Sequence, residues 1–396
     1  MNARGAHKKP AFGPVTWSNP RLRALVYQVL AITVTVLIFG FMALTARANL
    51  ERQHIASGFG FLHHTSGFGV IQSLIPYSEE STYGRVFWVG LSNTLLVAVL
   101  GTVLAVSLGF VIGIARLSTN WLVAKLATVY VETLRNIPLL LQLFFWYFAL
   151  LRPLPGPRES ISLLPNVFLS NRGIAMPALQ ATPSTLLFLI VTIAAIVGAI
   201  LLRRRGLKNL IETGHSSRLG LVALAVLIGL PLLAILVLGA PFQMEMPVLA
   251  KFNFVGGWRL LPEFVALTFG LSIYTAAFIA EIVRSGILSV SKGQTEAAYA
   301  LGLNNMQTLR LVIIPQSMRV IVPPLTSQIL NLTKNSSLAV AIAYPDLVSI
   351  FAGTVLNQTG QAIEVIAMTM GVYLVISLIT SFAMNIYNAR VAIVER

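Results

Sequence analysis

The sequence predicts an all-α, polytopic membrane protein with about eight transmembrane helices. Apolar residues make up 56% of the 396 residues and charged residues only 10%, and the mean hydropathy is +0.80. Soluble domains carry about 25% charged residues, so this balance excludes an ordinary soluble fold. The apolar residues gather in runs of about 20 residues, which cross a bilayer as helices and are too long for membrane strands.

Eight apolar runs define the predicted spans. They cover residues 24–45, 88–114, 126–150, 184–202, 219–239, 264–287, 318–342 and 365–387. The first run follows a basic, polar start but is longer than the apolar part of a signal peptide, so we predict an uncleaved first span. The chain then divides into residues 1–85 (a tail, the first span and an external loop), 86–150, 151–263 (loops and two spans) and 264–396.

Lys and Arg residues are distributed unevenly over the loops between these spans. The two termini and the loops 115–125, 203–218 and 284–319 carry 18 of them, whereas the loops on the opposite side carry eight. Because Lys and Arg are retained on the cytoplasmic side, both termini are predicted to be cytoplasmic. The net charge of +15 reflects this retention rather than binding to nucleic acid. The same rule predicts that the loop containing residues 291–315 is cytoplasmic.

Residues 291–315 are predicted to form two short helices joined by a turn. Ser291 and Gln294 have the spacing of a capping box, and the alanine-rich turn after them favours helix. Gly302 suits the left-handed residue that closes this helix. Asn304 or Asn305 can cap the next helix, and Pro315 is expected to stop it. By itself the segment is either a plain surface link between two spans or a contact site for a partner.

Two Glu–Arg pairs lie within or at the end of predicted spans. Glu132 precedes Arg135 by three residues, as Glu281 precedes Arg284, and this spacing puts both members of a pair on one helix face. Charge inside a membrane is costly and marks a structural or functional group. We interpret both pairs as structural ion pairs near the cytoplasmic surface, with a substrate or proton-relay role as the alternative.

The seventh span is the most polar of the eight. Its polar residues recur at helical spacing and include Ser327, Asn331, Lys334, Asn335 and Ser336. Pro323-Pro324, just before them, is expected to break the helix. A polar stripe beside such a break can line an aqueous translocation path. The alternative is that these groups form hydrogen bonds to neighbouring helices.

The chain lacks the motifs of a catalytic subunit. No Gly-x-x-x-x-Gly-Lys-Ser/Thr phosphate loop, His-Glu-x-x-His or Gly-x-Ser-x-Gly occurs. There is no cysteine, and the five histidines lie outside the predicted spans. These absences predict a chain that is not an enzyme and that holds no cofactor or metal.

The 291–315 segment resembles part of a known family. Glu296-Ala297-Ala298, followed by Gly302 and Pro315, is similar to the Glu-Ala-Ala loop of ABC importer permeases. Further segments resemble, in order, the pattern of the polar amino-acid permeases: Gly90–Leu95, Tyr130–Leu139, Ala280–Gly286 and Leu332–Leu338. The matching permease core covers residues 86–150 and 264–390, about half of the chain.

The resemblance implies a type I ABC importer permease core with extra helices, in a bacterial inner membrane. A pair of ATPase subunits would drive transport, a second permease (by family analogy a paralogue) would complete the path, and a periplasmic amino-acid-binding protein would deliver the substrate. Residues 291–315 would be the loop that couples to the ATPase. In it Glu296 offers a carboxylate, Ala297 and Ala298 leave room for close approach, and Gly302 sets the angle between the helices.

The family's usual subunit has five spans, and the extra spans of this chain indicate a particular group within the family. With its first span and the two spans in residues 151–263, the chain is similar to the larger permease subunit of the general L-amino-acid or glutamate/glutamine/aspartate/asparagine importers of Gram-negative bacteria. Asn335-Ser336 departs from the more frequent Asp-Thr of the family, which leaves the substrate contacts open. An ion-gradient-driven secondary amino-acid transporter, which would need no ATPase, is the alternative function.

Overall fold

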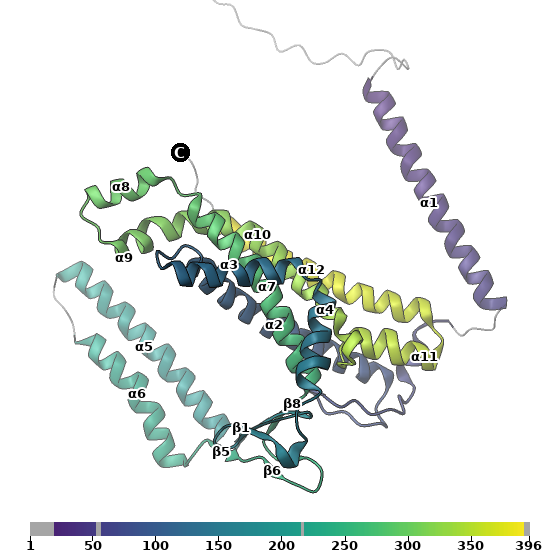
Figure 1. The fold of residues 1–396 in the computed structure, drawn as a ribbon, viewed down its shortest axis with the longest axis horizontal. Coiled ribbons are helices and arrows are strands. Elements are labelled where there is room, and N and C mark those ends of the chain that lie inside the picture. Colours follow the sequence, from purple (N-terminus) through teal and green to yellow (C-terminus); the bar gives the residue numbers. More distant parts are fainter. Residues whose placement is uncertain (1–19, 53–56, 215–217, 392–396) are drawn as a thin grey trace, which may run out of the picture.

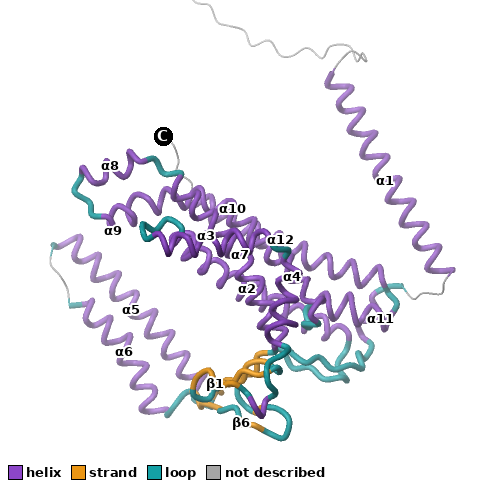
Figure 2. The backbone as a smooth tube through the Cα atoms, viewed as in Figure 1, coloured by secondary structure: helices purple, strands orange, loops and turns teal. Residues whose placement is uncertain are grey.

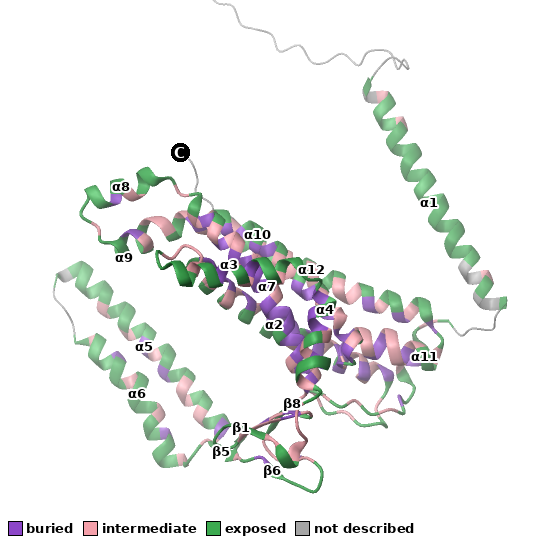
Figure 3. Ribbon diagram, in the orientation of Figure 1, coloured by how far each residue is buried: buried purple, intermediate pink, exposed green. Residues whose placement is uncertain are grey.

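Helices make up most of the structure, a computed structural model in which residues 20–52, 57–214 and 218–391 are described (Figure 1). Both chain ends, predicted to be cytoplasmic, lie outside these ranges. Helices α2, α7, α10 and α12 pack together as the core, whereas α1 and the pair α5–α6 lie apart from it. Buried residues gather in the core helices, and α1, α5 and α6 are largely exposed (Figure 3). The core is therefore the part of the chain that folds around itself.

Six helices within the described residues are long and apolar enough to cross a membrane. They lie within α1 Pro20–Arg52, α2 Tyr83–Ala115, α5 Thr185–Thr213, α6 Leu219–Leu238, α7 Pro262–Leu288 and α12 Ala362–Val391. A bent pair makes a possible seventh, namely α3 Trp121–Asn136 with α4 Leu139–Phe144 and the π-helix η2 Phe145–Leu151. The predicted span 318–342 does not meet this measure, because its helix α10 Ile314–Asn335 carries too many polar groups.

The predicted span 126–150 is bent by 107° between α3 and α4. Ile137 is extended, with φ −99° and ψ 129°, because the ring of Pro138 disfavours the helical region for the residue before it. The side-chain amide of Gln142 donates to the carbonyls of Leu134 and Ile137 at 2.8 and 2.9 Å. These bonds satisfy carbonyls that the break leaves without helical partners. The run is thus a broken span or a re-entrant loop rather than one straight helix.

Helix α10 is continuous where the sequence predicts interruptions. Helical backbone runs through α9 Asn305–Thr308, the π-helix η4 Leu309–Ile313 and α10. Pro315 lies in the first turn of α10, and Pro323-Pro324 lie inside it. The predictions that Pro315 stops a helix and that Pro323-Pro324 break one are therefore wrong. Proline has a helical φ itself, and membrane helices tolerate it through local adjustments such as the π-turn before Pro315.

Small residues at every fourth position of α2 bring it close to α7. They are Gly101, Ala105, Gly109 and Gly113, all of them buried. A Cβ on Gly109 would lie 2.5 Å from Cγ2 of Ile279, and one on Gly113 would lie 2.7 Å from the carbonyl oxygen of Ala280. Side chains at these two positions would force the helices apart, so the contact depends on glycine.

The end of the core opposite the 291–315 hairpin is closed by residues 343–347. This segment follows the 3₁₀-helix η5 Ser336–Ile342 and leads into the π-helix η6 Val348–Val355 and α11 Leu356–Thr359. The buried amide of Asn93 donates to the carbonyl of Pro345 at 2.8 Å, and the hydroxyl of Thr94 accepts from the amide of Leu347 at 3.0 Å. The short 3₁₀-helix η1 Phe59–His63 packs at the same end, on the start of α2.

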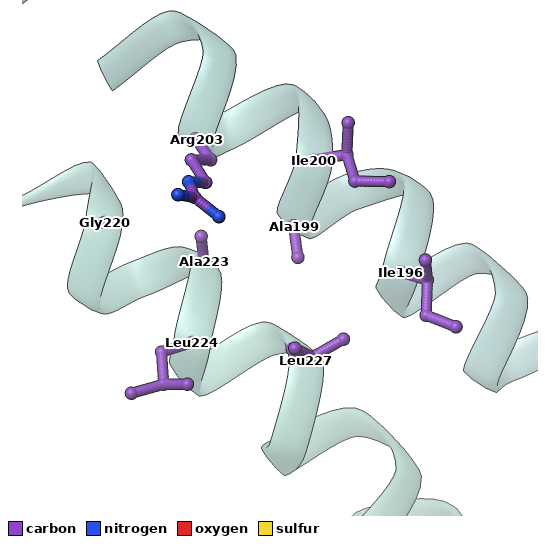
Figure 4. A pocket seen from close by; sticks show the side chains of 8 residues that line it. All are labelled: Ile196, Ala199, Ile200, Arg203, Gly220, Ala223, Leu224 and Leu227. Atoms are coloured by element: carbon purple, nitrogen blue, oxygen red, sulfur yellow. The ribbon is translucent and has the colours of Figure 1, made fainter. Parts of the chain in front are cut away.

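Residues 151–263 add a helical hairpin to the core. Helix α5 packs along α6, and neither packs along a core helix. A groove of about 420 Å³ lies between them. Figure 4 shows its lining, with Ala199, Ala223 and larger aliphatic side chains, and Arg203 at one side. The groove is apolar apart from this arginine, as expected for a seam between two lipid-facing helices.

The same insertion also contains strands, which we call the β-module (residues 161–181 and 242–260; Figure 2). Its strands are β1 Ile161–Leu164, β2 Val167–Ser170, β3 Gly173–Met176, β4 Ala178–Ala181, β5 Phe242–Glu245, β6 Val248–Leu249, β7 Phe254–Val255 and β8 Trp258–Leu260. They form an antiparallel sheet of order β1-β2-β3-β8 and two further antiparallel pairs, β4-β5 and β6-β7. A short 3₁₀-helix, η3 Pro157–Glu159, precedes them. The all-α prediction is therefore incomplete, because strands this short leave little periodicity in the sequence.

Candidate coupling and translocation sites

The 291–315 hairpin projects beyond one end of the core helices (Figure 1). Its first helix, α8 Lys292–Ala300, ends at Gly302, whose φ of +76° is left-handed. The amide of Gly302 donates to the carbonyl of Tyr299 at 2.9 Å, and the amide of Leu303 donates to that of Ala298 at 3.1 Å. This pair of bonds is a Schellman motif, which closes a helix and turns the chain. Gly302 thus lies where the sequence places the turn between the two helices.

One of the two predicted caps of the hairpin is confirmed, Asn304 at the start of α9, and the other, a capping box at Ser291, is wrong. Ser291 is the N-cap residue of α8, but its side chain makes no capping hydrogen bond. The capping box is formed instead by Asn304 and Gln307 at the start of α9, with bonds of 2.9 and 3.0 Å. Gln294 is free for another role, and its side-chain oxygen accepts from the amide of Gln316 at 3.1 Å. That bond ties α8 to the start of α10.

The residues of the Glu-Ala-Ala sequence are not equivalent. Glu296 and Ala297 are exposed, whereas Ala298 is buried under its own hairpin. Ala298 is therefore part of the packing of the hairpin and not free to approach a partner. Exposed apolar side chains lie nearby, because Leu301 and Met306 keep 82% and 70% of their surface. Apolar side chains so exposed on a protruding hairpin are typical of a contact site for another protein.

Glu281 lies at the centre of a group of three arginines that joins α2, α3 and α7. Arg284 Nη2 lies 2.6 Å from Glu281 Oε1, and Arg116 is hydrogen-bonded to Glu281 Oε2. Arg135 Nη1 lies 4.0 Å from the same carboxylate, and its guanidinium stands 5.2 Å from the centre of the Phe278 ring. One carboxylate thus links the end of α2, the last turns of α7 and the end of α3 that precedes its bend.

The predicted pair of Glu132 with Arg135 does not form. Glu132 is exposed and has no ion-pair partner among the described residues, while Arg135 faces Glu281 instead. Spacing of three residues permits a pair on one helix but does not require it. Arg135 lies near Glu281 rather than Glu132 because α3 packs against α7.

The polar residues predicted to line a path divide into two groups. Ser327, Asn331 and Lys334 are exposed and form what we call the α10 polar face. The opposite side of α10, including Ile321, Leu325 and Leu332, is buried in the core. Asn335 is half-buried, and the buried Ser336 donates to the carbonyl of Thr333 at 2.7 Å. The α10 polar face therefore points away from the fold of its own chain.

Lys334 also borders a cavity of about 540 Å³ between α10, η6 and α12. Thr369, Tyr373 and Ser377 of α12 line its other side. Behind it the hydroxyl of Tyr373 donates to the fully buried Asp346 at 3.3 Å, and Ser349 donates its amide to the same carboxylate at 2.8 Å. The cavity thus combines one cation, several hydroxyls and an apolar wall.

Several residues of these sites were not singled out by the sequence. Arg116 lies in a predicted loop, and nothing local indicates that it reaches Glu281. Asp346 likewise follows the seventh predicted span, where its burial could not be expected. The four-residue spacing of Gly101, Ala105, Gly109 and Gly113 is the signal that could have predicted the contact of α2 with a neighbouring helix. Among the described residues, no group of three or more His, Asp or Glu could hold a metal ion.

Comparisons with known proteins agree with these features. The profile of the family described as "Binding-protein-dependent transport system inner membrane component" matches residues 101–393. The chain belongs to this family. The resemblance to ABC importer permeases inferred from the motifs is thereby confirmed.

Three curated relatives match nearly the whole chain. The putative amino-acid ABC transporter permease protein YhdX of Escherichia coli is 56% identical over 384 residues, 97% of this chain and 98% of that protein. The general L-amino acid transport system permease protein AapQ of Rhizobium johnstonii is 50% identical, over 96% of this chain and 94% of that protein. The glutamate/glutamine/aspartate/asparagine transport system permease protein BztB of Rhodobacter capsulatus is 42% identical, over 96% of each. The match thus includes the insertion and the first span.

Replacing Glu281 with Gln is expected to destabilise the protein, whereas the same change at Glu132 is not. Glu281→Gln removes the charge that three arginines share and should cost about 2–3 kcal/mol. Thermal unfolding of the purified protein in one detergent measures both variants against the wild type. An equal midpoint for Glu281→Gln and Glu132→Gln would contradict the central role of Glu281.

Proposed function

We propose that this chain is the permease subunit of an ATP-driven importer of polar L-amino acids. In this role it forms part of the translocation path, and a separate ATPase subunit, in two copies, hydrolyses ATP. Membership of the binding-protein-dependent family supports the importer. The names of the three relatives support amino acids as the substrate class. The ion-gradient-driven alternative receives no such support.

The observation that carries the proposal is the form of the 291–315 hairpin. It stands outside the core, exposes Glu296, Ala297, Leu301 and Met306, and is joined to α10 without a break. A load applied to the hairpin would reach the membrane helices through the continuous helical backbone from α9 to α10, and through the bond of Gln294 to Gln316. A permease that receives work by contact needs such a connection.

The α10 polar face supports a path shared with a second permease. Ser327, Asn331 and Lys334 belong to a membrane-depth helix, and lipid would leave their polar groups unsatisfied. We propose that α10 is an eighth crossing helix, that a paralogous permease covers this face, and that the two chains enclose the path. A periplasmic binding protein would deliver the amino acid at the end closed by residues 343–347.

The distribution of charge supports an orientation in the membrane. The hairpin end of the core carries Arg116, Arg284, Lys292 and Arg310, and the α5–α6 turn on the same side follows Arg203-Arg204-Arg205. The positive-inside rule supports a cytoplasmic hairpin, cytoplasmic termini and a periplasmic β-module in a bacterial inner membrane.

Gly302→Val is expected to uncouple ATP hydrolysis from uptake. A β-branched residue at φ +76° is strained by about 1–2 kcal/mol, so the turn between α8 and α9 should shift. With the partners reconstituted in liposomes, we expect ATP hydrolysis to persist while amino acid transported per ATP falls at least tenfold.

Gly360→Val is the matched control for this change. Gly360 has a similar φ of +68° and open space around it, but lies at the opposite end of the core. Its variant should lose stability without losing coupling. Wild-type uptake by Gly302→Val, or equal uncoupling by both variants, would refute the role of the hairpin.

Asn331→Leu is expected to slow transport and leave assembly intact. It removes a polar group from the α10 polar face without disturbing the buried side of the helix. Uptake kinetics and co-purification of the subunits measure the two effects. Thr192→Leu, on α5 outside the core, is the control and should transport normally. Normal uptake by Asn331→Leu would place the path elsewhere.

A further inference from the structure

A second cavity, of about 650 Å³, lies where the β-module meets the core. Its lining includes three arginines, one glutamate and two asparagines: Arg152, Arg172, Arg259, Glu263, Asn171 and Asn253. We call it the arginine pocket. It lies at the end of the core opposite the 291–315 hairpin, which is the periplasmic end under the proposed function.

Separate segments of the chain build the arginine pocket. Arg152 follows η2 at the end of the bent pair, Arg172 lies in the turn between β2 and β3, and Arg259 lies on β8. The antiparallel register that pairs Arg259 with Ala175 keeps β8 beside β3. The backbone amide of Asn171 donates to the carbonyl of Pro155 at 2.9 Å, and this bond holds the β2–β3 turn near Arg152. Only the insertion makes this assembly possible.

The charges of the arginine pocket are not balanced within the described chain. None of its three arginines forms an ion pair with a described residue. Glu263 is the one carboxylate in the lining, and it already accepts a hydrogen bond from the hydroxyl of Tyr147 at 2.7 Å. The lining therefore carries three positive charges against one negative. Like charges around one cavity repel one another, and an anion bound between them relieves that repulsion.

The donors present suit a carboxylate. Guanidinium groups offer planar pairs of N–H donors that match the two oxygens of a carboxylate, and the side-chain NH2 groups of Asn171 and Asn253 add neutral donors. Glu263 complements an ammonium group. A ligand with two carboxylates and one ammonium, as in an acidic amino acid, carries charges opposite in sign to those of the lining.

We propose that the arginine pocket is a binding site for carboxylate groups on the periplasmic face. The carboxylate comes either from a free acidic amino acid or from an acidic side chain of the binding protein, and the chemistry of recognition is the same. The proposal rests on the proposed function for the identity of both sources. It adds a site remote from the α10 polar face and built by the insertion.

The test uses the assembled transporter in lipid nanodiscs. One arm measures the binding of L-glutamate, L-aspartate and L-glutamine by calorimetry. The other measures the affinity of the substrate-free binding protein at low and high salt. Arg172→Gln and Arg259→Gln are compared with Arg158→Gln, an exposed arginine of the same insertion whose guanidinium donates to the carbonyl of Lys251 and does not line the pocket.

We expect both pocket variants, and not Arg158→Gln, to weaken binding at least tenfold in one arm. Loss in the amino-acid arm, for glutamate and aspartate but not glutamine, identifies a free acidic amino acid as the ligand. Loss in the protein arm, accompanied by a smaller salt dependence, identifies a side chain of the binding protein.

Wild-type affinity of both variants in both arms would overturn the proposal, as would the absence of binding to the wild type in both arms. These results are distinguishable from failure of the proposed function. If the proposed function itself were wrong, the wild-type transporter would show no ATP-dependent amino-acid uptake at all. The unfolding midpoint of each variant shows whether a loss of binding reflects misfolding. The two variants lie on separate segments, so the same loss in both indicates the pocket they share.

Discussion

The close contact between α2 and α7 is the constraint on which the rest of the structure depends. Apolar side chains gain little from leaving lipid for another helix, so membrane helices associate through close packing and hydrogen bonds. Gly109 and Gly113 allow that packing, since a Cβ at either position would overlap α7. At the hairpin end of this seam, Glu281 gathers Arg116, Arg135 and Arg284. At the other end, Asn93 and Thr94 of α2 hold residues 343–347.

This seam leaves two features of the core without partners in the chain. One side of α10 packs on α7, which turns Ser327, Asn331 and Lys334 outward. The 291–315 hairpin lies beyond the packed region and keeps Leu301 and Met306 exposed. A membrane subunit that exposes a polar face in the bilayer, and apolar side chains on a hairpin outside it, needs partners to cover both surfaces. The proposed partners, a second permease and an ATPase, correspond to these two surfaces.

The sequence predicts the helices of this protein better than its interactions. Long apolar runs and Gly302 at a turn are local signals, and most of them correspond to observed elements. Pro138 is the one local signal of the bend in residues 126–150, and a single proline inside a long apolar run does not distinguish a bent helix from a straight one. Pro315 and Pro323-Pro324 predict helix ends that do not occur, because tertiary packing keeps a helix intact through them. The β-module left no periodic pattern long enough to predict.

The candidate sites were predictable only in part, for a related reason. The Glu-Ala-Ala sequence identifies the hairpin, but whether Ala298 is exposed depends on how α8 packs. Glu281 and Arg284 form a pair within one turn of helix, whereas the approach of Arg116 and Arg135 needs three helices in place. The arginine pocket combines residues about 100 positions apart, which no local pattern connects. Contacts between segments distant in the sequence are therefore what the structure reveals and local sequence patterns do not.

The central claim is that the 291–315 hairpin contacts a separate ATPase, and the chain offers a clean way to measure this. Because the protein has no cysteine, Ala297→Cys carries a single thiol on an exposed position of the hairpin. The thiol is labelled with a maleimide that carries a benzophenone, and the measurement is photo-crosslinking in membranes that contain the partner subunits, with Leu179→Cys on β4 as the control. The account predicts a crosslink to the ATPase subunit from position 297 and none from position 179. Absence of the ATPase from the crosslinked product of Ala297→Cys, or an equal yield from both positions, would contradict it.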